Sequence, residues 1–160
     1  MLPFKLELNA SFYFPDVTRP TVTAFDTFDL NNGVLHLSVS EAVPLESIRT
    51  NATILQSFYT QPESSLPILR SPLASDSSNG LYVTLTLSAE DLNAIKVDEF
   101  LASINSNTFF SFTSLFLTDY YANAVIPVPT TAAINSLTFV ADTTAPFLTA
   151  FDLYVANSSV

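Results

Sequence analysis

The 160-residue chain has no cysteine, no tryptophan, one histidine and only two glycines. The absence of cysteine excludes disulfide bonds and thiolate metal sites. With one histidine and no glycine-rich phosphate loop, the usual pairs of nucleophile and base cannot be assembled, so we expect no enzymatic activity. A pair of carboxylates leaves a glycosidase as the remaining catalytic alternative, but no pattern in the sequence indicates the deep cleft that it needs.

Positive charge and long apolar runs are also scarce. Five lysines and arginines stand against 15 aspartates and glutamates, a net charge of −10 that disfavours nucleic acid and anionic membranes as partners. No apolar run reaches the ~18 residues of a membrane span, so we expect no membrane insertion. The first 20 residues include Lys5, Glu7 and Asp16 without an apolar block, which predicts that they are not a signal peptide.

Serine and threonine supply the polar surface instead. They account for 37 residues, whereas charged residues make up only 12% of the chain, and such a surface suits an extracellular protein with attached sugar. Three sequons are present, and one or two of them are expected by chance in a chain of this composition. Their asparagines are the predicted sites of N-linked glycans: Asn9, Asn51 and Asn157.

Apolar and polar residues alternate with a period of two in several segments, which predicts half-buried strands. These segments are 34–39, 81–87, 109–115 and 137–140, and residues 21–29 are predicted as a further strand. Residues 88–96 differ and predict a short helix, with Ser88 as its cap and Leu92 and Ile95 on one face. We therefore predict an all-β fold, an immunoglobulin-like antiparallel β-sandwich with one short helix in a connection.

The end of the chain repeats its beginning. Residues 142–160 match residues 16–34 at nine of 19 positions, with an offset of 126 residues (146 − 20) set by Pro20 and Pro146. A period of this length is a whole domain. We expect residues 1–18 to correspond to the end of a preceding repeat and residues 19–145 to form the sandwich. Residues 146–160 would be the first strand of a following repeat, or a strand donated to a neighbouring subunit.

Acidic residues near the repeat junctions suggest calcium, which binds six to eight oxygen atoms, several of them from carboxylates. A sandwich with these residues at one pole would allow the ion to stiffen the joint between units. The alternative is that the aspartates cap turns by accepting hydrogen bonds from their own backbone. The candidate ligands are Asp16, Asp26, Asp119, Asp142 and Asp152.

The remaining candidate residues are aromatic or titratable. Tyr120 and Tyr121 stand in a polar loop and are candidates for contact with carbohydrate or a partner, whereas the phenylalanines of 109–116 favour the core. His36 alternates outward from a strand and is expected to face solvent.

The repeat resembles a known family. The motif Asp-x-Thr-x-Pro followed by Ala-Phe-Asp, and the run Leu35–Val43, are similar to the opening of bacterial-type, cadherin-like immunoglobulin-like repeats. Residues 88–96 and 107–113 resemble a longer version found in tandem in large extracellular surface proteins and mastigoneme-like filament proteins. The loop 119–125 resembles that family's Asp-x-x-Gly-Asn turn, with Ala122 in place of glycine. The resemblance implies a structural or adhesive extracellular module, often glycosylated and sometimes stiffened by calcium.

These observations predict a structural subunit of a glycosylated extracellular filament, in which copies of the chain join head to tail by β-strand addition. The predicted interface residues are Phe147, Phe151 and Leu153. Alternatively, the chain is a section of a longer tandem array, in which the same strands belong to neighbouring repeats of one polypeptide. The alternative function is an adhesive or carbohydrate-binding repeat module of a large cell-surface protein.

Overall fold

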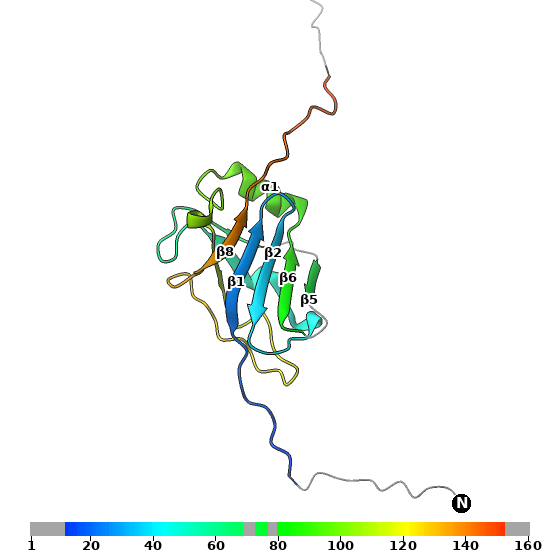
Figure 1. Cartoon of the computed structure of the whole chain (residues 1–160), viewed down its shortest axis with the longest axis vertical. Coiled ribbons are helices and arrows are strands. Elements are labelled where there is room, and N and C mark those ends of the chain that lie inside the picture. The colour runs from blue at the N-terminus through cyan, green and yellow to red at the C-terminus, as the bar shows by residue number, and fades with distance from the viewer. Residues whose placement is uncertain (1–11, 69–72, 77–79, 153–160) are drawn as a thin grey trace, which may run out of the picture.

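The computed structural model describes residues 12–68, 73–76 and 80–152, with the side chains of 73–76 left out (Figure 1). Eight strands, one α-helix and three short 3-10 helices lie in these residues. The strands are β1 (Val22–Asp29), β2 (Val34–Val39), β3 (Thr53–Gln56), β4 (Ser65–Pro67), β5 (Leu73–Asp76), β6 (Tyr82–Thr86), β7 (Phe109–Phe112) and β8 (Ile134–Val140). The helices are η1 (Leu45–Ser47), η2 (Thr50–Ala52), α1 (Ala89–Val97) and η3 (Asn105–Asn107).

The strands form one curled sheet in the order β4-β3-β7-β8-β1-β2-β6-β5. Strand β8 pairs in parallel with β1 and antiparallel with β7, so it belongs to both halves of the sheet. The halves enclose one core, in which the rings of Phe25 on β1 and Phe110 on β7 lie 5.6 Å apart. The predicted all-β, sandwich-like class is therefore confirmed.

The alternation predicted for β2 and β6 is confirmed by burial, because Leu35, Leu37 and Val83 face the core and His36 faces solvent. Strand β7 is shorter than predicted and ends at Phe112. The expectation that serine and threonine face water fails on β7, where Ser111 is buried.

A buried hydrogen-bond network explains the position of Ser111. Its hydroxyl donates to Gln56 Oε1 on the neighbouring strand β3, at 2.9 Å. The amide of Gln56 donates in turn to the carbonyl oxygens of Phe58 and Thr130. All the polar atoms of this group are satisfied, so the core accommodates them without an unpaired donor or acceptor.

The predicted helix is present as α1. The hydroxyl of its N-cap Ser88 accepts a hydrogen bond from the Asp91 N–H at 3.1 Å, and Lys96 lies in its last turn, which suits the helix dipole. Ile95 is buried in the core, while Leu92 packs beside Gly33 in the turn between β1 and β2. Helix α1 thus covers the pole of the sandwich at which β1 and β8 end (Figure 1).

Two extended segments leave the sandwich at opposite poles (Figure 1). The N-terminal segment (residues 12–20) leads into β1 at one pole, and the C-terminal segment (residues 141–152) follows β8 at the other. We call these the N-terminal pole and the C-terminal pole. The sandwich contains its own first and last strands, β1 and β8, so the chain itself fills the positions of both strands in the sheet. Among the described residues, no helix is long and apolar enough to cross a bilayer.

Candidate functional site

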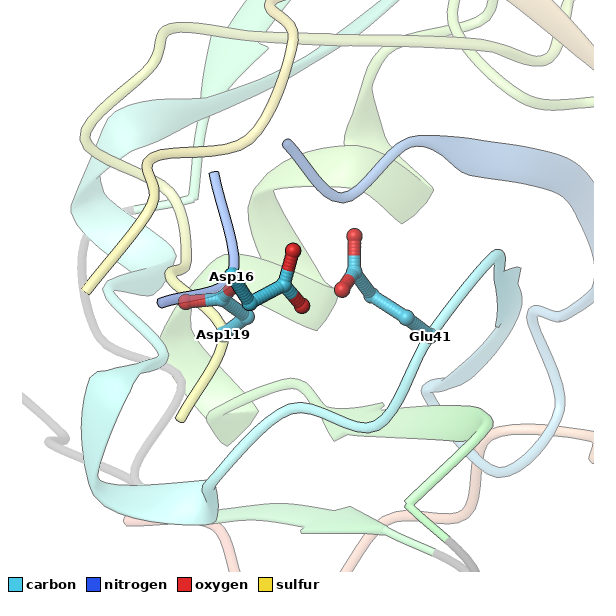
Figure 2. A group of neighbouring side chains, drawn as sticks. All are labelled: Asp16, Glu41 and Asp119. Atoms are coloured by element: carbon cyan, nitrogen blue, oxygen red, sulfur yellow. The ribbon is translucent and has the colours of Figure 1, made fainter. Parts of the chain in front are cut away.

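Three carboxylates meet at the N-terminal pole and form an acidic trio, Asp16, Glu41 and Asp119. One oxygen from each lies within 4.8 Å of the others. The residues come from three separate parts of the chain: the N-terminal segment, the turn after β2 and the loop 117–125. Figure 2 shows the carboxylates of Asp16 and Glu41 pointing toward one another. Three negative charges at this spacing repel one another unless a cation or a proton compensates them.

Asp119 is the buried member of the acidic trio, with 3% of its surface exposed. Burial alone would raise the pKa of its carboxyl group. Hydrogen bonds from the Asn123 side chain and from the N–H groups of Asn123 and Tyr121 outweigh that effect and hold the pKa below its usual value. Asp119 therefore keeps its charge while it fixes the conformation of its own loop.

The same loop contains Ala122, whose φ of +65° lies in the left-handed region that glycine favours. The Ala122 N–H donates to the carbonyl oxygen of Asp119, which closes the turn. Position 122 therefore has a backbone conformation that glycine would adopt more readily than alanine.

The N-terminal segment is bound along this loop. Asp16 Oδ1 accepts a hydrogen bond from the Thr18 N–H at 2.8 Å, and the Asn123 amide donates to the backbone oxygen of Asp16. The Arg19 guanidinium donates to the carbonyl oxygens of Ala124 and Val125, both at 2.8 Å. These contacts hold Asp16 beside Asp119.

Glu41 completes the acidic trio and is not among the ligands predicted from the sequence. Its carboxylate accepts no hydrogen bond from the residues that the structure describes. Burial raises its pKa, and the charges of Asp119 and Asp16 raise it further. No sequence signal links Glu41 to Asp16, because only the turn after β2 brings the two side chains together.

The other predicted calcium ligands lie elsewhere. Asp26 on β1 accepts a hydrogen bond from the Ser38 hydroxyl on β2, at 2.7 Å. Asp142 is at the C-terminal pole and Asp152 is exposed in the C-terminal segment. Only Asp16 and Asp119 of the five predicted ligands are brought together. Calcium at the acidic trio stays a prediction, and three of its six carboxylate oxygens already accept hydrogen bonds.

A second cluster, at the C-terminal pole, holds the second copy of the repeated motif. Asp142 Oδ2 lies 2.9 Å from Lys96 Nζ on α1, and Asp142 Oδ1 accepts a hydrogen bond from the Thr144 N–H. The hydrogen bond from Lys96, followed by that from Thr144, lowers the pKa of Asp142. Asn31 Oδ1, in the turn after β1, accepts from the Thr143 N–H and the Thr144 hydroxyl. The alternative prediction, that Asp16 and Asp142 accept from their own backbone, describes both residues.

The predicted glycosylation sites are only partly described. Asn51 is exposed on η2, and the hydroxyl of Thr53 in the same sequon is buried and donates to the Thr50 carbonyl oxygen. A groove of about 670 Å³ runs beside Asn51 and is lined by residues of β3 and of the segment after β7. Asn9 and Asn157 lie outside the described residues.

The predicted contact residues are exposed where they are described. Phe147 and Phe151 are exposed in the C-terminal segment, and Leu153 lies outside the described residues. Tyr120 and Tyr121 are exposed on the loop 117–125, but neither lines the groove beside Asn51.

No protein-family model and no curated protein sequence matches this chain. Among solved structures, it is similar to the crystal structure of the S-layer protein rSbsC, with 13% sequence identity and a TM-score of 0.48. The similarity covers 81% of this chain and 14% of that one. At this level of similarity, no functional statement about this chain follows. The resemblance to immunoglobulin-like repeats therefore stays a prediction.

Proposed function

We propose that this chain is a structural unit of an extracellular filament in which units follow one another head to tail. The observation that carries the proposal is the exposure of the C-terminal segment. This segment repeats the sequence of β1, yet Phe147, Leu148 and Phe151 lie outside the sandwich and are all exposed. These exposed apolar side chains lie in a segment whose sequence matches a strand. Their burial against a second unit would remove them from water.

Among the strands that the structure describes, β4 and β5 form the two edges of the sheet and could accept an added strand. Strand β4 has only three residues and includes Pro67, which has no N–H to donate, so it is a poor acceptor. The edge of β5 is the better acceptor for the C-terminal segment of a neighbouring copy. In a longer chain, the same segment would instead become the first strand of the next unit. Both arrangements propagate in one direction because the contact joins two different surfaces.

The apolar side chains of the C-terminal segment would supply part of the free energy of such a joint. Burial of Phe147, Phe151 and Leu153 contributes about 5 kcal/mol before the cost of ordering the segment. Backbone hydrogen bonds along the added strand would fix its register against the neighbouring strand, and would add less to the affinity. An exposed hydroxyl-rich surface, with glycans at sequons such as Asn51, would keep the assembled units soluble.

Removal of residues 146–160 tests the filament directly. Sedimentation of the full chain should show association that grows with concentration, and the shortened chain should sediment as a single unit. Leu115→Ser is the control, because Leu115 is an exposed apolar residue of the sandwich, beside β3 in the segment after β7. A full chain that stays monomeric at every concentration contradicts self-assembly and leaves the tandem array as the alternative.

Glycosylation is tested separately on material from the native source. Mass spectrometry before and after enzymatic removal of N-linked glycans should show a glycan on Asn51, and Asn51→Gln should remove it. An unmodified Asn51 in secreted material would contradict this part of the proposal.

A second function, adhesion, is favoured by the exposure of Tyr120 and Tyr121 on one loop at the N-terminal pole. Neighbouring exposed aromatic rings are suited to stacking on sugar rings. Glycan-array binding that disappears in the double variant Tyr120→Ala, Tyr121→Ala would support a carbohydrate-binding module. Equal binding by the variant would remove it.

A further inference from the structure

The repeated Asp-x-Thr motif lies at both poles of the sandwich, residues 16–18 at the N-terminal pole and residues 142–144 at the C-terminal pole (Figure 1). Asp142 stands at the position of Asp16 in the period of 126 residues (142 − 126 = 16), and Thr144 stands at the position of Thr18. The structure therefore describes the same Asp-x-Thr segment twice. Residues 16–18 are bound to the sandwich that follows them in the chain. Residues 142–144 are bound to the same sandwich, which for them is the preceding unit.

The two sets of contacts use different atoms of the segment. On the following unit, the Asn123 amide binds the backbone oxygen of Asp16. On the preceding unit, Lys96 binds Asp142 Oδ2, and Asn31 binds the Thr143 N–H and the Thr144 hydroxyl. The internal bond from threonine N–H to aspartate Oδ1 is present in both copies. Because no atom is required twice, one Asp-x-Thr segment has the donors and acceptors to bind both units at once.

We propose that consecutive units share one Asp-x-Thr segment, and that Lys96 of the preceding unit is the cation that compensates the acidic trio of the following unit. This joint rests on the proposed head-to-tail function and specifies its contact. In this structure the ammonium group of Lys96 lies 2.9 Å from a carboxylate oxygen of Asp142, the residue equivalent to Asp16 in the repeat. In a following unit, the Asp142 carboxylate would take the place of the Asp16 carboxylate in the trio. The partner surface is therefore the N-terminal pole of another unit of this repeat, with its Glu41 and Asp119 beside that carboxylate.

Charge supports this assignment. Lys96 is one of only two lysines in the chain, and an ammonium group has three donors, enough for more than one carboxylate. In the single unit, the Glu41 carboxylate accepts no hydrogen bond from the described residues. Burial raises the pKa of Glu41, and the negative charges of Asp119 and Asp16 raise it further. A lysine beside the trio would supply the missing donor and the opposite charge.

One difference between the two copies of the motif increases the role of Lys96. Arg19, which binds the carbonyl oxygens of Ala124 and Val125, is replaced by Ala145 at the equivalent position of the second copy. A unit that begins at residue 142 would lack this clamp on its loop. The contact of Lys96 with the trio would then be a main polar link across the joint.

The test is to extend the full chain after Val160 with residues 35–160 of the same sequence, so that residues 142–160 become the head of a complete second unit. A zero-length carbodiimide reagent joins lysine to a carboxylate only when the two groups are in contact. We expect products that join Lys96 to Glu41 or Asp119 of the added unit. Lys96→Gln in the first unit should abolish them, and Glu41→Gln in the added unit should remove the corresponding product. Glu46, exposed on η1 outside the trio, is the control carboxylate and should give no product.

The outcomes separate this joint from the proposed function. If the added unit folds and Lys96 reacts with Asp142 alone, the shared joint is wrong and the head-to-tail function stands. If the added unit does not fold, a second version with residues 16–160 placed after Ala141 gives it the native head, and the same products decide. Failure of both versions to fold contradicts the repeat and the proposed function with it. Products that form only after chelation of calcium would show that the ion, and not Lys96, compensates the trio, which overturns the proposal.

Discussion

Phe25 and Phe151 occupy the same position of the repeat, 126 residues apart, yet their environments are opposite. Phe25 is 1% exposed and packs against Phe110 in the core, whereas Phe151 is 76% exposed in the C-terminal segment. A side chain that the sequence copies from a core position is therefore present without a core around it. This contrast is the basis for proposing that a second unit packs on the C-terminal segment.

The first prediction concerns these two phenylalanines. Phe151→Ser should leave the melting temperature of dilute chain unchanged, and it should weaken association by about 2 kcal/mol, roughly 30-fold in the dissociation constant. Phe25→Ser should destabilise the sandwich itself, by about 3 kcal/mol or more. Calorimetry and sedimentation of both variants check the pair. Equal association by the Phe151 variant would exclude this side chain from the joint.

The second prediction concerns Phe110, which lies fully buried between the two halves of the sheet and contacts the rings of Phe25, Phe112 and Phe116. Phe110→Ala should lower the free energy of unfolding by about 3–5 kcal/mol, because it leaves a cavity in the core. Leu115→Ala, at an exposed position, should change it by less than about 0.5 kcal/mol. Denaturant unfolding measures both. Similar values for the two variants would mean that the halves do not share one core.

The third prediction concerns Ala122 in the loop that holds Asp119. Ala122→Gly should stabilise the chain by up to about 1 kcal/mol, because it relieves the left-handed strain, although glycine loses more entropy on folding. Ala94→Gly, in the middle of α1, is the matched control and should destabilise by about 1 kcal/mol. A loss of thermal stability in Ala122→Gly would argue against this turn.

The fourth prediction concerns the pH dependence of Glu41. Its folded pKa is raised above the unfolded value, so the relative stability that it contributes is present at low pH and is lost as pH rises through the folded pKa. Glu41→Gln should therefore raise the melting temperature of the single unit at pH 7, and the difference should vanish below about pH 4. Asp119 has the opposite effect, because its pKa is lower in the folded chain than in the unfolded chain. Its carboxylate therefore stabilises the fold at pH values above the unfolded-state pKa, and this stability is lost as the pH falls through the folded-state pKa. Asp119→Asn should thus destabilise at pH 7 and matter least in strong acid.

Local patterns predicted the elements whose determinants are local. The cap and charge pattern around Ser88 predicted α1, and alternation predicted β2 and β6. Strands β3, β4 and β5 were not predicted, because they have only three or four residues and depend on their pairing partners. The expectation that serine and threonine lie at the surface fails at Ser111, because alternation cannot reveal a buried partner such as Gln56.

In the two charged clusters, too, the sequence predicted the local contacts and not the tertiary ones. The repeat identified Asp16 and Asp142 as equivalent, and turn chemistry anticipated their internal hydrogen bonds. Their partners were beyond prediction, because Glu41 and Lys96 approach them only through tertiary folding. Five aspartates that looked like one set in the sequence are distributed between the two poles, the β1–β2 pair and the C-terminal segment.

Hydrogen exchange of the chain extended with residues 35–160 tests the central claim, that the C-terminal segment is the first strand of another unit. The account predicts that the backbone amides of residues 148–152 become protected to a degree similar to those of β1, while they exchange freely in dilute chain of the original length. Rapid exchange of these amides in the extended chain, with the added residues folded, would contradict it.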